Sequence, residues 1–534
     1  MATDLSYVHR ESFMQPRVRS LLATALLLAA TGASAQTLRI GFADPISSLD
    51  PQINNYAGDR SVALHFFESL ADRRDDRTMP GLAKSWKVLD PLTWQFDLRD
   101  DVKWSDGTPM TADDFVFSFE RARAVPGSVA SYAGALRTVD AVSAKDAHTL
   151  IVKTKAPNAN LLPDINSVYI VSRHAGAKAE SADYNSGKAL VGTGPYRFVS
   201  YVPGDRTIFE RNDAYWGPKA EWDKVDYRFI ANASSRTAAL LAGDVDVIDK
   251  VAPTDIARLK QSPKVSVYAY QGLRALIIQP SFRKGPNDNI RDNAGKPLAD
   301  NPLLDVRVRK ALSLAVNRQA IDERIMQGTV TEANQWMPSN TFGYNANVKN
   351  IPFDPAQAKK LLAEAGYPEG FQLTVSVPGD RYPQAPEAMQ AVAQFWTRIG
   401  IKVQLDVMPW AVYAGKANKN ELAVSVIAWG NGSGEAAYAL TNILTTVDSA
   451  KGLGASNWGH YSNPAVDKAL QDATAEFDEA KRRAILENSV QIVSDDVGII
   501  PLFHYQNIWA ARKGLKVEPL VSDRTAAMMV TEQK

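Results

Sequence analysis

An apolar run that ends in a glycine-rich loop decides the fold of this chain. Residues 422–435 read LAVSVIAWGNGSGE. A run of this length bounded by glycines predicts a buried strand of an α/β sheet. In such sheets ligands are commonly bound where strands end, and glycine lets the backbone approach a ligand closely. We therefore predict the ligand site at residues 429–435. The alternative is a tight turn with Trp429 in the core and Glu435 in solvent.

Helices are predicted between this strand and its neighbours in the sequence. Residues 373–377 and 401–407 also have the composition of strands. Asp305, Asp354–Pro355 and Asn463–Pro464 each supply a capping side chain before an apolar stripe with helical spacing. The second half of the chain is therefore predicted to alternate helices and strands.

The first half contains a strand with a clear period of two. Apolar and polar residues alternate over 93–98, which predicts a half-buried strand. We expect residues 102–104 to form its partner strand. Thr111, followed three residues later by Asp114, predicts a capping box at the start of a helix. This unit is predicted to be scaffold.

The composition is that of a water-soluble globular protein with several domains. The chain has 534 residues, of which 45% are hydrophobic and 22% charged, and its formal net charge is +1. A nearly neutral chain has no overall field to attract nucleic acid, so we expect no nucleic-acid partner. The lack of cysteine excludes a disulfide scaffold, and the length indicates about three domains.

Residues 1–35 have the features of a secretory signal peptide. Two arginines precede an apolar run at 21–30, and Ala33-Ser34-Ala35 offers small residues for cleavage after Ala35. The run is shorter than the roughly 20 residues that span a bilayer, and the alternative is a buried apolar helix. Cleavage removes 3 of the 60 basic and 2 of the 59 acidic residues, which leaves 57 of each. We expect a periplasmic protein, because a lipid anchor would need a cysteine.

The sequence contains no recognisable catalytic motif. The glycines at 430–434 place Ser433 outside the Gly-x-Ser-x-Gly frame of a serine hydrolase, and no Walker A motif occurs. Five of the six histidines follow the predicted cleavage site, and none has the spacing of a metal-binding pair. We therefore expect neither a metal nor a cofactor, and a binding protein rather than an enzyme.

Several short motifs follow one another along nearly the whole mature chain. They are Leu49-Asp50-Pro51, residues 94–99 with 102–109 and 111–114, residues 192–196, residues 213–216, residues 306–311, and Asp354-Pro355 with residues 358–367. Together they resemble the periplasmic solute-binding proteins that feed oligopeptide, dipeptide and nickel ABC importers, which are family 5 of the extracellular solute-binding proteins.

The resemblance implies a two-lobed α/β fold around a ligand cleft, the type II periplasmic-binding-protein fold with an extra inserted domain. Hinges are implied near Gly272 and at residues 497–502. The implied segments are 36–62, 187–272 and 493–534 for the core of lobe 1, 63–186 for the insertion and 273–492 for lobe 2.

The resemblance also implies how such a protein works. Closure of the lobes would bury the ligand, and the ligand would favour the closed state because it binds that state better. The closed form would dock on a membrane permease whose separate ATPase drives import. We expect the binding protein itself to be a monomer.

One departure from the family bears on the ligand. Peptide-binding members resemble one another in an aspartate three residues after the tryptophan of the Trp429 block, where it pairs with the peptide α-ammonium. Here that residue is Gly432. A buried unpaired ammonium is costly, so a free peptide N-terminus is not recognised in the usual way unless Glu435 supplies the carboxylate.

The candidate ligand-binding residues come from the predicted loop, from the resemblance and from position in the chain. Tyr132 resembles a cleft tyrosine of the peptide-binding members, and the polar segment 44–59 could form a second ligand loop. Glu435 or Arg274 is expected to counter a ligand charge, with aromatic side chains as walls. The full set is Tyr56, Tyr132, Arg274, Trp410, Trp429, Asn431, Glu435 and Tyr438.

The predicted cargo is a peptide or a peptide-like solute such as an opine or a modified amino acid. A sugar, a bile-acid-like amphiphile or a metal chelate is the alternative within the class, and direct metal contact would need His460 or His504 near the cleft. Outside the class, a secreted hydrolase stays open because carboxylates can converge from distant positions. A chemoreceptor-coupled sensor or a secreted chaperone is a further alternative.

Overall fold

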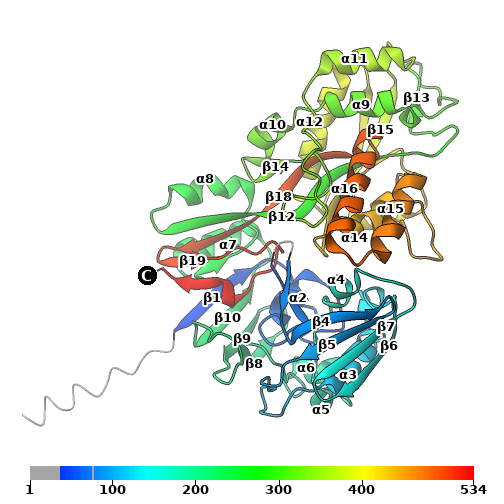
Figure 1. Cartoon of the computed structure of the whole chain (residues 1–534). Coiled ribbons are helices and arrows are strands. Elements are labelled where there is room, and N and C mark those ends of the chain that lie inside the picture. The colour runs from blue at the N-terminus through cyan, green and yellow to red at the C-terminus, as the bar shows by residue number, and fades with distance from the viewer. Residues whose placement is uncertain (1–35, 75–76, 534) are drawn as a thin grey trace, which may run out of the picture.

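A mixed sheet of 12 strands runs through the whole molecule. The computed structural model describes residues 36–74 and 77–533, so the predicted signal peptide lies outside the described residues. The strand order is β13-β15-β17-β12-β18-β11-β1-β10-β9-β8, with β14 paired to β18 and β16 to β15. Figure 1 shows two groups of elements joined by the long strands β12 (Val265–Pro280) and β18 (Ile500–Arg512). The predicted two-lobed α/β fold is confirmed.

Lobe 1 is built on one end of this sheet. Strand β1 pairs in parallel with β10 on one side and β11 on the other, and the strands beyond β10 are antiparallel. The elements of this part are β1 (Thr37–Phe42), α2 (Ala57–Ala63), β8 (Tyr196–Val202), β9 (Arg206–Arg211), β10 (Lys224–Phe229), α7 (Ala233–Ala242), β11 (Val247–Ile248), α8 (Pro253–Gln261), β19 (Leu515–Val517) and β20 (Val530–Glu532).

A smaller antiparallel sheet, in the order β4-β5-β7-β6, lies between β1 and β8 in the chain, where the resemblance predicts the insertion. Strand β5 has the predicted alternation of burial, and the Thr111 N–H donates to Asp114 Oδ2 at 2.9 Å in the predicted capping box. The elements are β2 (Ala71–Arg74), β3 (Arg77–Pro80), β4 (Ala83–Asp90), β5 (Thr93–Leu98), α3 (Ala112–Ala122), β6 (Val139–Asp146), β7 (Thr149–Thr154), α4 (Leu161–Ile165), α5 (Arg173–Gly176) and α6 (Ser181–Asn185).

The predicted partner of β5 is wrong. Strand β5 pairs with β4 and β7, whereas Trp104 belongs to a tight loop in which its N–H donates to Thr108 O at 2.8 Å. Val102 and Trp104 are nevertheless buried in the same core as the sheet. Their alternation therefore reports burial on one side, not strand pairing.

Lobe 2 is built on the other end of the large sheet. The predicted caps are confirmed, since Asp305, Asp354 and Asn463 each accept a hydrogen bond from a first-turn N–H. The elements are β13 (Ile290–Arg291), α9 (Val306–Leu314), α10 (Arg318–Ile321), β14 (Val330–Glu332), α11 (Pro355–Glu364), β15 (Gln372–Pro378), α12 (Ala385–Thr397), β16 (Lys402–Met408), α13 (Trp410–Asn418), β17 (Val424–Gly430), α14 (Ala436–Ala439), α15 (Pro464–Ala475) and α16 (Glu479–Asp495).

The hydrophobic cores change along the two long strands. In β12, Val265 packs in a core of lobe 1 and Ala275 in the core of lobe 2. In β18 the change falls between Tyr505, in lobe 2, and Ile508, in lobe 1. The sequence places the end of lobe 2 at residue 492, and we propose instead that lobe 2 extends to Tyr505.

The ladder between β12 and β18 is interrupted at the same place. Gln271 pairs with Gln506, and the next pair along is Ala275 with His504. Gly272 lies in this interruption, where the first hinge is predicted. A Cβ atom there would lie 2.8 Å from the Tyr505 carbonyl oxygen, so the strands could not approach as closely. On β18 the break lies between His504 and Gln506, after the predicted second hinge at 497–502.

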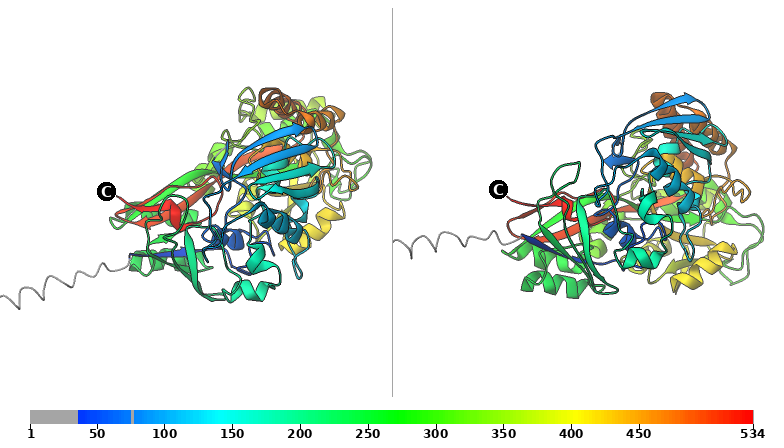
Figure 2. Two further views of the ribbon diagram at one scale, coloured as in Figure 1. Left: turned by 60° about the horizontal axis from the view of Figure 1, so that its bottom comes forward. Right: turned by 90° about the horizontal axis from the view of Figure 1, so that it is seen from below.

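A second set of contacts joins the lobes near the start of α4. The Ala159 N–H donates to Thr474 O at 2.8 Å. The Arg482 guanidinium contacts both the Asn160 side-chain oxygen and the Glu435 carboxylate. Figures 1 and 2 show the β4–β7 sheet beside the α14–α16 helices from every side drawn. The lobes therefore touch on two sides, at the long strands and at this contact.

Asp164 lies beside this second contact in a strongly desolvated position. Burial raises the pKa of Asp164 to about 7, and the Glu435 charge acts in the same direction. A hydrogen bond from Asn158 and the charges of Arg137 and Arg482 lower this pKa. Its ionisation is thus linked to the contact between the lobes.

Gly272→Ala should lower the free energy of unfolding by about 1–3 kcal/mol, because the new methyl group would clash with backbone atoms of β18. Gly415→Ala is the matched control: a Cβ there meets nothing within 4 Å, and α13 should gain about 0.5–1 kcal/mol. Urea unfolding followed by circular dichroism measures both. Equal midpoints for the two variants would contradict the close packing at Gly272.

Asp164→Asn should make stability less dependent on pH. With its pKa raised to about 7, Asp164 holds a proton in the folded protein that the unfolded chain releases near pH 4. Stability from this proton is therefore lost as pH rises to about 7. Thermal unfolding between pH 5 and 7.5 should show this loss in the wild type and in the exposed control Asp213→Asn. A wild-type slope in Asp164→Asn would contradict the assignment.

Candidate functional site

Three parallel strands of lobe 2 end at the same edge of the sheet. Strand β15 pairs in parallel with β16 and with β17. Trp410 follows the end of β16, and Trp429 is the second-last residue of β17, so both tryptophans lie at this edge. The Trp410 N–H donates to Asp380 Oδ1 at 2.7 Å, which ties the end of β16 to that of β15. This is the position that the α/β pattern predicts for a ligand site.

Trp410 belongs to an aromatic cluster at this edge. Its ring centroid lies 5.8 Å from that of Tyr413, 6.1 Å from Tyr382 and 6.2 Å from Trp458. The Arg381 guanidinium carbon lies 5.1 Å from the Trp410 ring centroid. The Trp410 ring is half-buried, so it can offer a ligand only part of its surface.

The loop after β17 carries buried polar atoms that have no partner in the described part of the chain. They are the Trp429 indole N–H, both amide atoms of Asn431 and the Ser433 hydroxyl. Asn431 is 0% exposed. Because proteins rarely leave buried polar groups unsatisfied, such a group of atoms indicates a place for a ligand or ordered water.

Backbone N–H groups of this loop form hydrogen bonds within the chain, whereas several of its side-chain polar atoms do not. The Asn431 N–H donates to Leu273 O at 2.9 Å, and the Gly434 N–H donates to Asn431 O at 2.9 Å. Gly434 has a φ of +63°, which favours glycine. A Cβ at Gly432 would meet nothing within 4 Å. The loop is therefore held firmly, with open space at residue 432.

The structure gives Glu435 a partner inside the chain. The side chain is buried, with 8% of the residue exposed, and forms an ion pair with Arg482. Its carboxylate is therefore not the free charge that the sequence predicts for a ligand ammonium. The alternative of a turn with Glu435 in solvent is wrong, since the residue is buried. Contact of Glu435 with a ligand stays a prediction.

Arg274 lies where β12 meets the end of β17. It is in register with Gly430, and its guanidinium donates to Ala428 O at 2.8 Å. A Cβ at Gly430 would lie 3.0 Å from the Arg274 guanidinium, so the glycine makes room for this side chain. Arg274 is half-buried and forms no ion pair within the residues described. It remains a candidate for contact with an anionic group.

Tyr438 links the loop to charged residues of both lobes. Its ring centroid lies 5.4 Å from that of Trp429, and the residue is 37% exposed. Burial and the Asp164 charge raise the pKa of its hydroxyl, whereas Arg60, Arg137 and Arg274 lower it. Charges from both lobes therefore act on the hydroxyl of this tyrosine.

Tyr132 is a buried residue of lobe 1 beside Arg60. It is 2% exposed, its hydroxyl has no partner among the described residues, and burial raises its pKa to about 12. The Arg60 guanidinium carbon lies 5.9 Å from its ring centroid. Tyr56 is 44% exposed at the start of α2, where its carbonyl accepts from the Arg60 N–H at 3.0 Å. No contact brings the Tyr56 ring to the other candidates.

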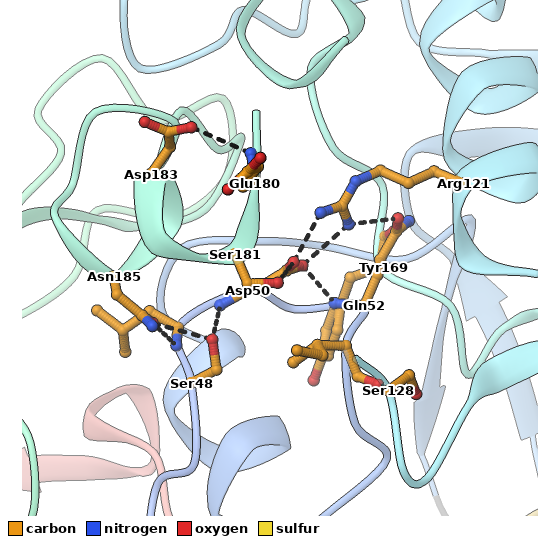
Figure 3. A network of polar contacts seen from close by, with 12 residues as sticks. Ser48, Asp50, Gln52, Arg121, Ser128, Tyr169, Glu180, Ser181, Asp183 and Asn185 are labelled. Carbon is orange, nitrogen blue, oxygen red and sulfur yellow. Dashed lines mark hydrogen bonds and ion pairs between the residues drawn. The ribbon is translucent and has the colours of Figure 1, made fainter. Parts of the chain in front are cut away.

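The predicted second ligand loop, residues 44–59, is held by a buried ion pair. Asp50 is fully buried and binds the Arg121 guanidinium through both oxygens, at 2.9 Å and 2.6 Å, while the Ser181 hydroxyl donates to it at 2.7 Å. Figure 3 shows Asp50 at the centre of this network, with Gln52 beside Tyr169. The motif Leu49-Asp50-Pro51 thus orients the chain that enters α2.

Four charged residues of this region escaped the sequence analysis. They are Arg60, Arg137, Asp164 and Arg524. None belongs to a recognisable motif, and arginine is common on ordinary surfaces.

The structure gives no support for a metal site. Within residues 36–74 and 77–533, no group of three or more potential ligands could hold a metal ion. His504 is buried, and burial lowers its pKa to about 4, while His460 contacts the Asn420 side-chain oxygen at 2.5 Å.

None of the described helices is both long and apolar enough to cross a membrane.

Comparison with known proteins identifies the family. Residues 77–451 match the model of the bacterial extracellular solute-binding proteins, family 5. Heme-binding protein A of Haemophilus influenzae is 28% identical over 80% of this chain and 78% of its own, and the dipeptide-binding protein of Escherichia coli is 27% identical over 83% and 84%. The solved structure of HbpA2 from Haemophilus parasuis has a TM-score of 0.81, with 25% identity over 93% of this chain and 100% of its own. The chain therefore belongs to family 5 of the bacterial extracellular solute-binding proteins.

Proposed function

We propose that this protein captures a small peptide-like solute between its lobes in the periplasm and delivers it to the permease of an ABC importer. Family membership supports a solute-binding role, and the predicted signal peptide, cleaved after Ala35, supports the location. Similar proteins include one named for heme and one named for dipeptides, so the family leaves the ligand class open.

The unpartnered polar atoms of the Trp429 loop carry this proposal. A buried polar group without a partner costs about 1–3 kcal/mol, and Trp429, Asn431 and Ser433 provide several within five residues. The indole N–H is a donor, and the amide and hydroxyl groups can both donate and accept. A peptide-like solute supplies both kinds of partner, as N–H and C=O groups.

Closure of the lobes would follow from contacts on both sides. The Trp429 loop belongs to lobe 2 and Tyr132 to lobe 1, and each offers a buried group without a partner in the part of the chain described. A solute that satisfies both groups binds the closed arrangement better than the open one. It therefore shifts the equilibrium toward the form that a permease would recognise.

Native mass spectrometry of the mature protein, purified gently from the periplasm, tests this function. We expect a bound mass that leaves on denaturation. Asn431→Ala should lose it, because this change removes both unpartnered amide atoms, whereas the exposed control Asn293→Ala should keep it. A series of peptide masses would support the peptide class, and one non-peptide mass would contradict it. Protein that never carries a solute would contradict capture.

Gly432→Asp should create recognition of a peptide α-ammonium, since there is open space at this position for a carboxylate. We expect alanyl-alanine to bind at least tenfold more tightly than to the wild type, or about 1.4 kcal/mol. The neutral variant Gly432→Asn and the probe N-acetyl-alanyl-alanine should show no gain. Isothermal titration calorimetry of the three proteins with each of the two probes measures these affinities. An equal gain with the aspartate and asparagine variants would contradict the charge argument.

A further inference from the structure

Arg60 is an arginine of lobe 1 that lacks the partner its position would require. Its Nη1 donates to Asn55 Oδ1 at 2.6 Å, but its Nε is buried and has no partner among the described residues. The guanidinium carbon lies 5.9 Å from the ring centroids of both Tyr132 and Tyr169. Arg60 forms no ion pair in the described part of the chain, so its charge is not balanced by a bound carboxylate.

Arg524 and Arg60 are separated by 464 residues in the chain, but their charges are near enough to interact. Burial lowers the pKa of the Arg524 guanidinium, and the charge of Arg60 lowers it further. The Tyr169 and Tyr132 hydroxyls and the charge of the adjacent Asp523 oppose this. Over residues 36–74 and 77–533 its side chain forms neither a hydrogen bond nor an ion pair. The two guanidinium groups and the unpartnered Tyr132 hydroxyl therefore share one region.

The backbone next to Arg524 is anchored to lobe 1. The Thr525 hydroxyl donates to Asp249 Oδ2 at 2.8 Å, and the Tyr227 hydroxyl donates to Thr525 O at 2.8 Å. On the other side, the Asp523 carboxylate lies 3.7 Å from Lys250 Nζ. Arg524 is therefore held in place by its neighbours and not by a partner of its own side chain.

The nearby carboxylates do not cancel the two positive charges. Asp523 is paired with Lys250, whose amine also binds Asp44 at 2.6 Å. Asp59 accepts hydrogen bonds from Ser47, and burial raises its pKa, so its charged form is disfavoured. Like charges that share a desolvated region repel each other, and a bound anion removes this repulsion.

Arg121, in the same lobe, is an arginine whose charge is balanced by a buried carboxylate. Arg121 binds both oxygens of Asp50 at 2.9 Å and 2.6 Å, as Figure 3 shows. This two-pronged geometry suits a carboxylate because the guanidinium presents parallel N–H groups. Arg60 and Arg524 present the same guanidinium N–H donors, but no carboxylate of the described residues is bound to them.

We propose that Arg60, Arg524 and the Tyr132 hydroxyl form a subsite for a carboxylate group of the solute. The guanidinium N–H groups and the Tyr132 O–H donate to its oxygens. This subsite rests on the proposed solute-binding function and gives the solute an acidic group. The charge of Arg60 lowers the pKa of the Tyr438 hydroxyl, and the Tyr438 ring centroid lies 5.4 Å from that of Trp429, which relates this subsite to the Trp429 loop.

Malonate tests the subsite without knowledge of the natural solute. Protein whose native mass shows no bound solute is titrated with malonate at constant ionic strength, with neutral malonamide as the matched probe. We expect malonate to raise the unfolding temperature saturably and malonamide to have no effect. In Arg60→Gln and Arg524→Gln the apparent Kd for malonate should rise at least tenfold, and in Tyr132→Phe it should rise severalfold.

Arg398→Gln is the control, because this exposed arginine of lobe 2 also lacks an ion pair within the described residues. It should bind malonate like the wild type. If the glutamine variants fail to fold, Arg524→Lys keeps the charge but loses the two-pronged geometry and should still weaken malonate. No stabilisation of the wild type by malonate, or wild-type binding in the Arg60 and Arg524 variants, would overturn the subsite.

The two proposals fail in different ways. If native mass spectrometry finds a solute but malonate does not bind, the protein captures solutes and the carboxylate subsite is wrong. If malonate binds through Arg60 and Arg524 but no solute is ever carried, the anion site exists and the proposed capture is wrong.

Discussion

The antiparallel pairing of β12 with β18 is the constraint on which the rest of the structure depends. Both strands contribute side chains to the cores of both lobes, and their ladder breaks between Gln271 and Ala275. Arg274, inside this break, is in register with Gly430 at the end of β17. The interruption that separates the lobes therefore also positions the loop that carries the unpartnered polar atoms. The break in the ladder and the position of this loop therefore depend on the same few residues.

The charged side chains discussed above differ in whether their partner lies within the chain. Asp50 with Arg121, and Glu435 with Arg482, are buried pairs whose partners lie within the chain. Such pairs fix geometry, since removal of one partner would leave the other charge buried. Arg60 and Arg524 are half-buried and form no ion pair with a carboxylate in the part of the chain that is described. A buried charge left without a partner is a strong indication of where a ligand must supply one.

Local pattern predicted the elements well and their pairing poorly. The alternation over 93–98 and the caps at Asp305 and Asp354 depend on neighbours in the sequence, so they could be recognised there. The apolar alternation at 102–104 is equally clear, yet these residues form a loop. A period of two reports that one side is buried, and it does not say which strand lies alongside. The loop at 429–434 was found because glycines after a strand are a local signal.

The sequence by itself determined the α/β class, the helix starts, the glycine-rich loop after β17 and the motifs of the family. Each is encoded within a few consecutive residues, through propensity, capping or hydrophobic period. Only the tertiary structure decided what the charged groups do. Arg482 contacts Glu435, 47 residues away, and Asn160, 322 residues away. The charge of Arg60 lowers the pKa of Arg524 from the other end of the chain. Such encounters depend on how the lobes are connected and packed, and no local pattern records them.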